Sequence, residues 1–110
     1  MAKYTPERGD IVWLNFTPQS GHEQVGRRPA VVISPAAYNK KVGLALFCPI
    51  TSHVKDYPFE VALPKNLKIG GVILADQIKS LDWKAREVKF VVRLPGDSID
   101  EILKRARLLI

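Results

Sequence analysis

The sequence predicts a mainly β fold, in which short antiparallel strands form a curled sheet or small barrel and one helix ends the chain. Short apolar runs rich in β-branched and aromatic residues alternate with Pro and Gly, and helical periodicity is confined to the C-terminal end. Strands at such short spacing are typical of small all-β architectures. The predicted strands are Ile11–Phe16, Ala30–Ser34, Leu44–Ile50, Phe59–Leu63, Gly71–Ala75 and Glu87–Leu94.

The predicted C-terminal helix follows Pro95-Gly96-Asp97. Ser98 and Glu101 have the spacing of a capping box, so we expect the helix to begin at this pair. One helical face is apolar, and it carries Ile99, Ile102, Leu103, Ala106 and Ile110. Basic residues lie near the C-terminal end, where the helix dipole favours positive charge: Lys104, Arg105 and Arg107.

Length and composition indicate one domain spanning residues 1–110 of a globular protein, with 46% hydrophobic and 25% charged residues. No signal peptide or membrane-spanning run is found, so we expect a cytoplasmic protein with no membrane partner. The single cysteine, Cys48, lies in an apolar run and is interpreted as a small buried hydrophobe. One cysteine excludes disulfides and cysteine-bound zinc, and no cofactor or metal site is predicted.

The charge is +6, with a pI near 9.7, and it is uneven. Residues 1–55 carry seven Lys and Arg against three Asp and Glu. A clustered positive field favours a polyanionic partner, either nucleic acid or an acidic protein.

A segment of thirteen residues, Thr17 to Pro29, separates the first two predicted strands and has no apolar periodicity. A connection of this length in a compact domain is typical of a binding or catalytic loop. It contains Glu23, Gln24, Arg27 and Arg28, which can grip phosphate and move protons. A solvated surface turn is the alternative interpretation.

Several motifs occur in a specific order along almost the whole chain. They are Gly9-Asp10-Ile11-Val12-Trp13, Gly21-His22-Glu23-Gln24-Val25-Gly26-Arg27-Arg28-Pro29, Tyr38-Asn39, Pro49-Ile50-Thr51, Tyr57-Pro58-Phe59-Glu60-Val61 and Ala75-Asp76-Gln77-Ile78-Lys79-Ser80. In this order the motifs resemble those of the MazF/PemK toxin family. The resemblance implies a homodimeric, SH3-like β-barrel that cleaves single-stranded mRNA sequence-specifically and without metal, leaving 2′,3′-cyclic phosphate and 5′-hydroxyl ends. It also implies that an acidic, MazE-like antitoxin neutralises the toxin.

Three residues are predicted to be catalytic. Arg28 matches the family's essential arginine; a guanidinium keeps its proton at neutral pH, so it would stabilise the developing charge. Thr51 matches the family's threonine and would donate a hydrogen bond to the scissile phosphate. Glu23, the only carboxylate between Asp10 and Asp56, is either the general base or a residue that orients Arg28.

Single-stranded RNA is read by stacking and by hydrogen bonds to exposed base edges. The residues predicted to bind RNA are Phe16, Gln24, Arg27, Asn39, Gln77 and Lys79. Trp13 and Trp83 are predicted to belong to the core, although strand alternation also allows Trp13 to face a partner subunit.

Three alternatives remain at this stage. His22 and His53 lie beside predicted site residues and could form an acid and base pair. A gyrase-poisoning toxin of the CcdB type would share the fold, but this chain ends in Leu108-Leu109-Ile110, without the terminal Trp-Gly-Ile of that group. A non-catalytic RNA-binding module would keep the basic loop without needing Glu23 or Thr51.

Overall fold

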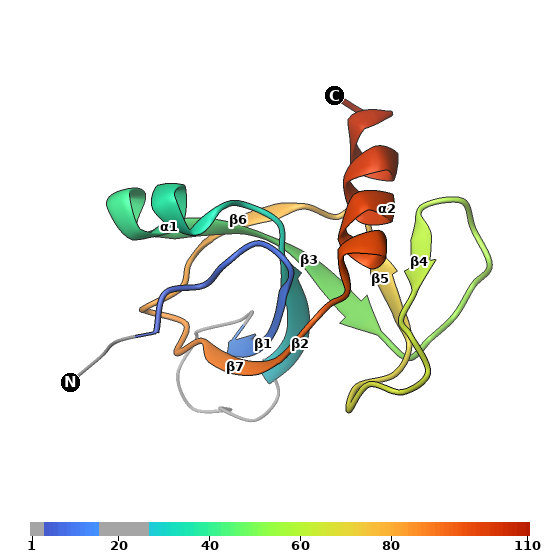
Figure 1. Cartoon of the computed structure of the whole chain (residues 1–110), viewed down its shortest axis with the longest axis horizontal. Helices are drawn as coiled ribbons and strands as arrows, with labels where there is room; N and C mark the ends of the chain where they lie inside the picture. Colours follow the sequence, from blue (N-terminus) through green and yellow to red (C-terminus); the bar gives the residue numbers. More distant parts are fainter. Residues whose placement is uncertain (1–3, 16–26) are drawn as a thin grey trace.

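The structure is a computed structural model that describes residues 4–15 and 27–110. Figure 1 shows a curved sheet and two helices that lie well apart. The elements in chain order are β1 (Asp10–Asn15), β2 (Arg27–Val32), α1 (Ala36–Val42), β3 (Leu44–Thr51), β4 (Glu60–Ala62), β5 (Val72–Leu74), β6 (Lys79–Asp82), β7 (Lys89–Arg93) and α2 (Gly96–Arg107). The predicted fold class, an antiparallel β architecture with a C-terminal helix, is confirmed.

The sheet is organised around β3, its longest strand. The strand order is β4-β5-β3-β2-β1-β7, and β6 also pairs with β3. The N-terminal half of β3 pairs with β6, from Leu44 opposite Asp82 to Phe47 opposite Lys79. Its C-terminal end pairs with β5, where Thr51 lies opposite Val72. Because β3 changes partners along its length, it joins the two halves of the curled sheet.

The central strands bury both of their faces. Alternation places Ile11, Val31 and Cys48 in one apolar cluster, which also contains Ile102 of α2. The intervening residues, such as Val12 and Phe47, belong to a second cluster closed by Trp83. Two covered faces explain why these strands appear in the sequence as almost continuous apolar runs. Trp83 is therefore a core residue, as predicted.

Helix α2 begins two residues earlier than the predicted capping box. Pro95 is its N-cap, with no side-chain capping bond, and the Ser98 N–H donates to the Pro95 carbonyl at 3.1 Å. Proline suits this position because its fixed φ of −63° leads into the helix. Ser98 thus lies inside the first turn, and Glu101 accepts from Arg105 Nε at 2.6 Å instead of capping. The capping-box prediction is wrong.

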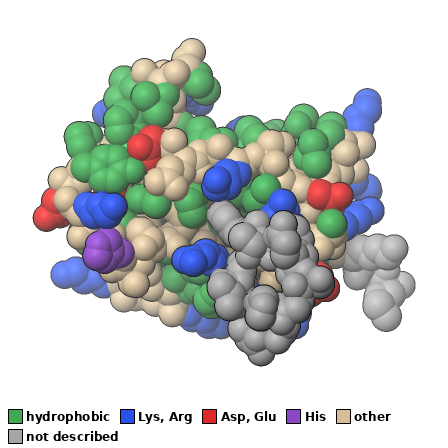
Figure 2. Space-filling model, turned by 180° about the vertical axis from the view of Figure 1, so that it is seen from behind, with side chains coloured by type: hydrophobic (Ala, Val, Ile, Leu, Met, Phe, Trp, Pro, Cys, Tyr) green, Lys and Arg blue, Asp and Glu red, His purple; other side chains and the backbone are tan. Residues whose placement is uncertain are grey.

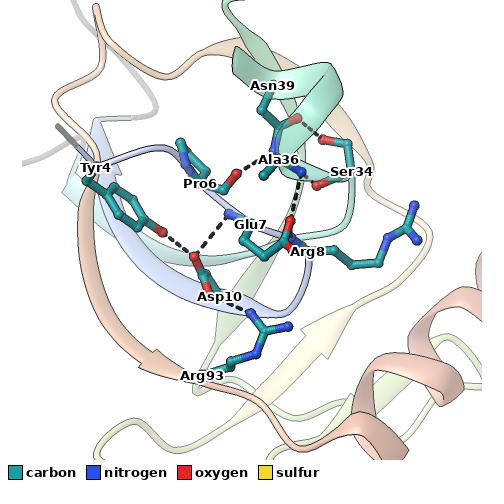
Figure 3. Close-up of polar contacts among 9 residues, drawn as sticks. All are labelled: Tyr4, Pro6, Glu7, Arg8, Asp10, Ser34, Ala36, Asn39 and Arg93. Carbon is teal, nitrogen blue, oxygen red and sulfur yellow. Dashed lines mark hydrogen bonds and ion pairs between the residues drawn. The ribbon is translucent and has the colours of Figure 1, made fainter. Parts of the chain in front are cut away.

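Helix α1 was not predicted, because its seven residues bury only Asn39 and have little apolar periodicity. Tertiary hydrogen bonds hold it (Figure 3). Asn39 Nδ2 donates to the Pro6 and Ser34 carbonyls at 2.8 and 3.0 Å, and Asn39 Oδ1 accepts from Ser34 Oγ at 2.6 Å. Glu7 Oε1 accepts from the Ala36 N–H at 2.7 Å. The helix ends at Gly43, whose φ of 83° is a left-handed conformation that glycine adopts without strain.

The segment before β1 is held by Asp10, which is buried. Its carboxylate accepts from the Tyr4 hydroxyl, from the Glu7 N–H at 3.0 Å and from Arg93 Nη1 at 2.9 Å (Figure 3). Burial, followed by the bond to Asp10, raises the pKa of Tyr4, so this phenol stays protonated as a donor. Asp10 therefore joins the chain before β1 to strand β7.

Two further predictions are corrected, and one strand was missed. Trp13 is 36% exposed instead of core, because its cross-strand neighbours, Pro29 and Lys89, leave the ring partly open. Ile110 is 94% exposed, since α2 ends at Arg107 and the predicted apolar face does not extend to the last residue. Strand β6 was not predicted because none of its four residues is buried, so it has no apolar pattern.

Cys48 is fully buried, and burial raises the pKa of its thiol to about 12. The thiol is therefore protonated at neutral pH and packs as a small apolar group, as predicted. Within residues 4–15 and 27–110, no helix has the length and apolar character needed to cross a membrane.

Candidate active site

Arg28 and Thr51 come from the same end of two neighbouring strands. The ladder between β2 and β3 pairs Val32 with Phe47 and ends with Ala30 opposite Pro49. Arg28 and Thr51 each lie two residues beyond that last pair, so the same register aligns them across the strands. Residues two apart on a strand share a face, so both side chains project on the side of Ala30 and Pro49. Arg28 is exposed and Thr51 is half-buried.

The structure places Arg27 and Arg28 in β2 instead of the predicted loop. Arg27 pairs with Asn15 and Arg28 with Leu14, both in β1. Strand pairing fixes the backbone of both arginines, while the Arg28 side chain remains in solvent. The exposed guanidinium of Arg28 is therefore free to meet a phosphate at this end of the strand.

The Thr51 hydroxyl has a defined orientation. Its Oγ1 accepts from the His53 backbone N–H at 3.1 Å. A hydroxyl has one donor and two acceptor lone pairs, so this contact occupies a lone pair and leaves the O–H to donate. Thr51 can therefore offer a hydrogen bond to an oxygen on the open side of the strand.

A hollow of about 180 Å³ opens beside Thr51. Its lining residues come from the end of β3, the following loop, β4, the end of β5 and the segment after it. The lining residues are Thr51, His53, Lys55, Tyr57, Glu60, Leu74 and Gln77. Of the residues predicted to bind RNA, Gln77 lies here together with the predicted catalytic residue Thr51. Gln77 is exposed, with its backbone N–H bonded to the Leu74 carbonyl at 3.2 Å.

Lys79 and Asn39 lie elsewhere. Lys79 is exposed on β6, opposite Phe47 of β3. Asn39 is fully buried, and its amide is bonded to Pro6 and Ser34, so it has no edge to present to a base. Asn39 therefore holds α1 in place, and its predicted role in RNA binding is wrong.

Four of the predicted or alternative site residues lie outside the described residues: Phe16, His22, Glu23 and Gln24. His53, the second member of the alternative histidine pair, is exposed and lines the hollow. Across the two described ranges, no group of three or more His, Cys, Asp and Glu is arranged to hold a metal ion.

Sequence reasoning assigned no role to Lys55, Tyr57 or Glu60, although all three line the hollow. Tyr57 and Glu60 belong to one of the quoted motifs, and this was the available signal. The Tyr57 hydroxyl donates to Asp76 Oδ1 at 2.7 Å, and this hydrogen bond raises the pKa of Tyr57. The hydrogen bond to Asp76 thus holds the ring of Tyr57, which lines the hollow.

Figure 2 shows basic side chains both in the middle of this face and around its edges, and acidic side chains towards its sides. An excess of positive charge favours a polyanionic partner. It agrees with the excess of basic residues in the first half of the sequence.

Comparison with known proteins identifies the family of this chain. Residues 7–110 match the family model described as PemK-like, MazF-like toxin of type II toxin–antitoxin system. The endoribonuclease toxin MazF of Escherichia coli K12 is 50% identical over 86 residues, which cover 78% of this chain and 77% of the relative.

Solved structures show the same similarity. A crystal structure of MazF (Form-I) from Deinococcus radiodurans is 52% identical, with a TM-score of 0.88 and coverage of 97% of both chains. A MazE–MazF crystal structure (Form-II) from the same organism is 47% identical, with a TM-score of 0.87 and coverage of 97% of this chain and 96% of that one. This chain therefore belongs to the family of PemK-like, MazF-like toxins of type II toxin–antitoxin systems.

Proposed function

We propose that this toxin is a sequence-specific, metal-independent endoribonuclease that cleaves single-stranded mRNA. The observation that carries the proposal is the register between β2 and β3, which brings Arg28 and Thr51 to the same end of adjacent strands, with a hollow beside Thr51. Relatives with 50% identity are named endoribonucleases, which supports the same assignment.

The proposed reaction is a transesterification within the RNA. A base removes the proton from a ribose 2′-hydroxyl, and the resulting oxygen attacks the adjacent phosphorus. The bond from phosphorus to the 5′-oxygen then breaks, and that oxygen takes up a proton. The products are a 2′,3′-cyclic phosphate and a 5′-hydroxyl.

Each candidate residue has a role that its chemistry permits. Arg28 offers planar paired donors to two phosphate oxygens, whose negative charge grows in the transition state. The O–H of Thr51, left as a donor by the His53 contact, hydrogen-bonds the same phosphate. We assign the general base to Glu23.

The proposed partners follow from the substrate and from the relatives. Single-stranded RNA is the substrate, and a MazE-like acidic antitoxin is the inhibitor, because a structural neighbour is a MazE–MazF complex. We further propose that the toxin is a homodimer and that it acts in the cytoplasm, where mRNA is translated. Cleavage of mRNA would inhibit translation and growth.

The test is cleavage of a long transcript by the purified protein, followed by mapping of the cut sites. Cleavage is expected to persist in EDTA and to stop when the nucleotide 5′ to the scissile phosphate is 2′-deoxy. Loss of activity on chelation, with the deoxy substrate still cut, would reject transesterification in favour of a metal-activated water. Incubation with gyrase in parallel tests the CcdB-type alternative.

A further inference from the structure

We propose that Arg105 of α2 is a positioning residue for the reaction at Thr51. It holds the β3–β4 loop, residues 52–59, and this loop orients the Thr51 hydroxyl. The inference rests on the proposed function, because that function gives Thr51 its contact with the scissile phosphate. Arg105 acts through the loop and is not itself a catalytic residue.

The Arg105 guanidinium joins α2 to the loop. Its Nη1 donates to the Pro58 carbonyl and lies 3.5 Å from the Glu60 carbonyl oxygen. Its Nε donates to Glu101 Oε2 at 2.6 Å, four residues earlier in the helix. This hydrogen bond lowers the pKa of Glu101, so the carboxylate stays ionised at neutral pH. Glu101 therefore holds the guanidinium in the orientation that directs Nη1 to the loop.

Helix α2 gives Arg105 a fixed base. The helix lies beside β4 (Figure 1). Ile102 and Ala106 on this helix are buried, and Ile102 belongs to the apolar cluster of the central strands. A side chain on a packed helix is placed more precisely than one on a loop. Arg105 thus ties an exposed loop to the core.

The loop has little packing of its own, so hydrogen bonds set its shape. Residues 52–56 are exposed. The Glu60 carboxylate accepts from the backbone N–H groups of Lys55 and Asp56, each at 2.9 Å. Asp56 has a φ of 60°, a conformation that non-glycine residues adopt rarely and that needs support from the surrounding structure. The position of Glu60, beside the Arg105 guanidinium, therefore decides where the middle of the loop lies.

The start of the loop is bonded to Thr51. The His53 backbone N–H donates to Thr51 Oγ1 at 3.1 Å, which leaves the Thr51 O–H to donate. Only Val54 separates His53 from Lys55, whose N–H is held by Glu60. A displacement of Glu60 is thus passed along a short stretch of chain to the Thr51 hydroxyl. Loss of Arg105 should leave the Thr51 backbone in its strand and make the hydroxyl less well oriented.

Steady-state kinetics measure the effect on the reaction. A misplacement of about 1 Å costs about 100-fold in rate, and we expect the looser loop of Arg105→Ala to lower kcat about tenfold per folded molecule. KM for RNA should change less than about twofold, because the lost orientation matters mainly in the transition state. Arg105→Lys should recover part of the rate, because an ammonium still donates to the Pro58 carbonyl. Arg107→Ala removes an exposed charge from the same helix and should behave as wild type.

A double-mutant cycle tests whether Arg105 acts through Thr51. In a Thr51→Ala protein no hydroxyl remains to be oriented, so adding Arg105→Ala should lower kcat less than about twofold. An equal loss in both backgrounds would show that Arg105 affects the reaction by another route and would overturn the proposal. If Arg105→Ala does not fold, Glu101→Gln takes its place, because it removes the charge that holds the guanidinium. Its smaller loss of kcat should likewise vanish in the Thr51→Ala protein.

NMR relaxation measures the loop without the reaction. The backbone order parameters of His53, Lys55 and Asp56 should fall from about 0.85 in wild type to below about 0.6 in Arg105→Ala. Arg107→Ala should leave them unchanged. If wild type cleaves no RNA, the proposed function fails, and lowered order parameters would support the hold of Arg105 on the loop without the reaction. Unchanged order parameters in Arg105→Ala would overturn the positioning role, whatever the kinetics show.

Discussion

Gly71 lies directly against the backbone of Thr51. A Cβ atom added to Gly71 would lie 2.3 Å from the Thr51 carbonyl oxygen, and the φ of Gly71 is 115°. Only glycine adopts this conformation without strain and permits this approach. Gly71 immediately precedes β5, whose first residue, Val72, pairs with Thr51. The position of a predicted catalytic residue thus depends on the absence of a side chain in a neighbouring segment.

Gly71→Ala is therefore expected to move Thr51 and to impair catalysis in the protein that still folds. The strained φ should cost about 1–3 kcal/mol in the free energy of unfolding. Displacement of Thr51 by about 1 Å should lower kcat/KM about 100-fold. Denaturant unfolding and cleavage kinetics per folded molecule measure the two effects.

Gly70→Ala is the matched control. A Cβ on Gly70 would meet no atom within 4 Å, and no positive φ is required there. This variant should keep wild-type activity. Equal activity of the two alanine variants would show that the position of Thr51 does not limit the reaction.

Arg28→Ala tests the stabilisation of developing charge. Removing donors that act mainly in the transition state should lower kcat about 1,000-fold while weakening RNA binding much less. Arg28→Lys should restore only part of the rate, because an ammonium lacks the paired planar donors. Lys41→Ala, at an exposed position of α1, controls for the loss of one positive charge. An unchanged kcat with a raised KM would show that Arg28 binds RNA without stabilising the transition state.

Glu23→Gln tests the general base. The variant keeps the size of the side chain but accepts no proton, so kcat should fall about 100-fold or more. Because a base acts only when ionised, the wild-type rate should rise with pH over an acidic limb that the variant lacks. A rate and pH profile equal to those of wild type would remove Glu23 from this role.

The histidine pair is tested in the same kinetic series. His22→Ala combined with His53→Ala should keep most of the activity, including kcat and its pH dependence. If kcat collapses while the fold is intact, the two imidazoles are the acid and base.

Asn39→Ala tests the structural role that burial gives this residue. Truncation would leave the carbonyls of Pro6 and Ser34 without their Asn39 donors, which should cost about 3 kcal/mol in the free energy of unfolding. Cleavage per folded molecule and cut-site preference should stay unchanged. Asn66→Ala, at an exposed position, is the control for amide loss. An altered cut-site preference with full stability would return Asn39 to the RNA site.

The sequence predicts those strands and helices whose limits are marked by apolar runs and by neighbouring Gly or Pro. β3 begins at Leu44, as predicted, because its apolar run follows a glycine that ends α1. β2 begins at Arg27, before its apolar residues, because pairing with β1 extends the strand through Pro29. The partner strand determines how far such pairing extends, so the residues of β2 alone do not predict where the strand begins. The two arginines were therefore placed in a loop.

The candidate site is predictable only in part for the same reason. Arg28 and Thr51 could be named from motifs, but their alignment depends on the register between β2 and β3. One residue that lines the hollow is Glu60, whose carboxylate accepts from backbone N–H groups four and five residues earlier. The polar side chain of Asn39 could either contact an RNA base or hold the fold together, and only its complete burial shows that its role is structural. The alignment of Arg28 with Thr51, the shape of the hollow and the role of Asn39 all depend on tertiary contacts, which residue type alone does not predict.

The last prediction concerns inhibition by an acidic antitoxin. A surface that holds RNA phosphates around Arg28 should also attract Asp and Glu side chains. Arg28 is exposed on β2, so both ligands can reach it. A disordered acidic segment that folds over the same surface would exclude the RNA. We expect inhibition to be direct competition.

An acidic antitoxin peptide and a non-cleavable RNA, made with 2′-deoxy at the cut site, should therefore not bind one site together. Both affinities should fall as salt rises, and the RNA affinity should fall more steeply if phosphate contacts dominate. Arg28→Ala should weaken both ligands, whereas Lys41→Ala should weaken neither beyond the effect of net charge. If saturating peptide leaves the RNA affinity unchanged, the two ligands occupy different surfaces, and the antitoxin must act through a conformational change of the toxin.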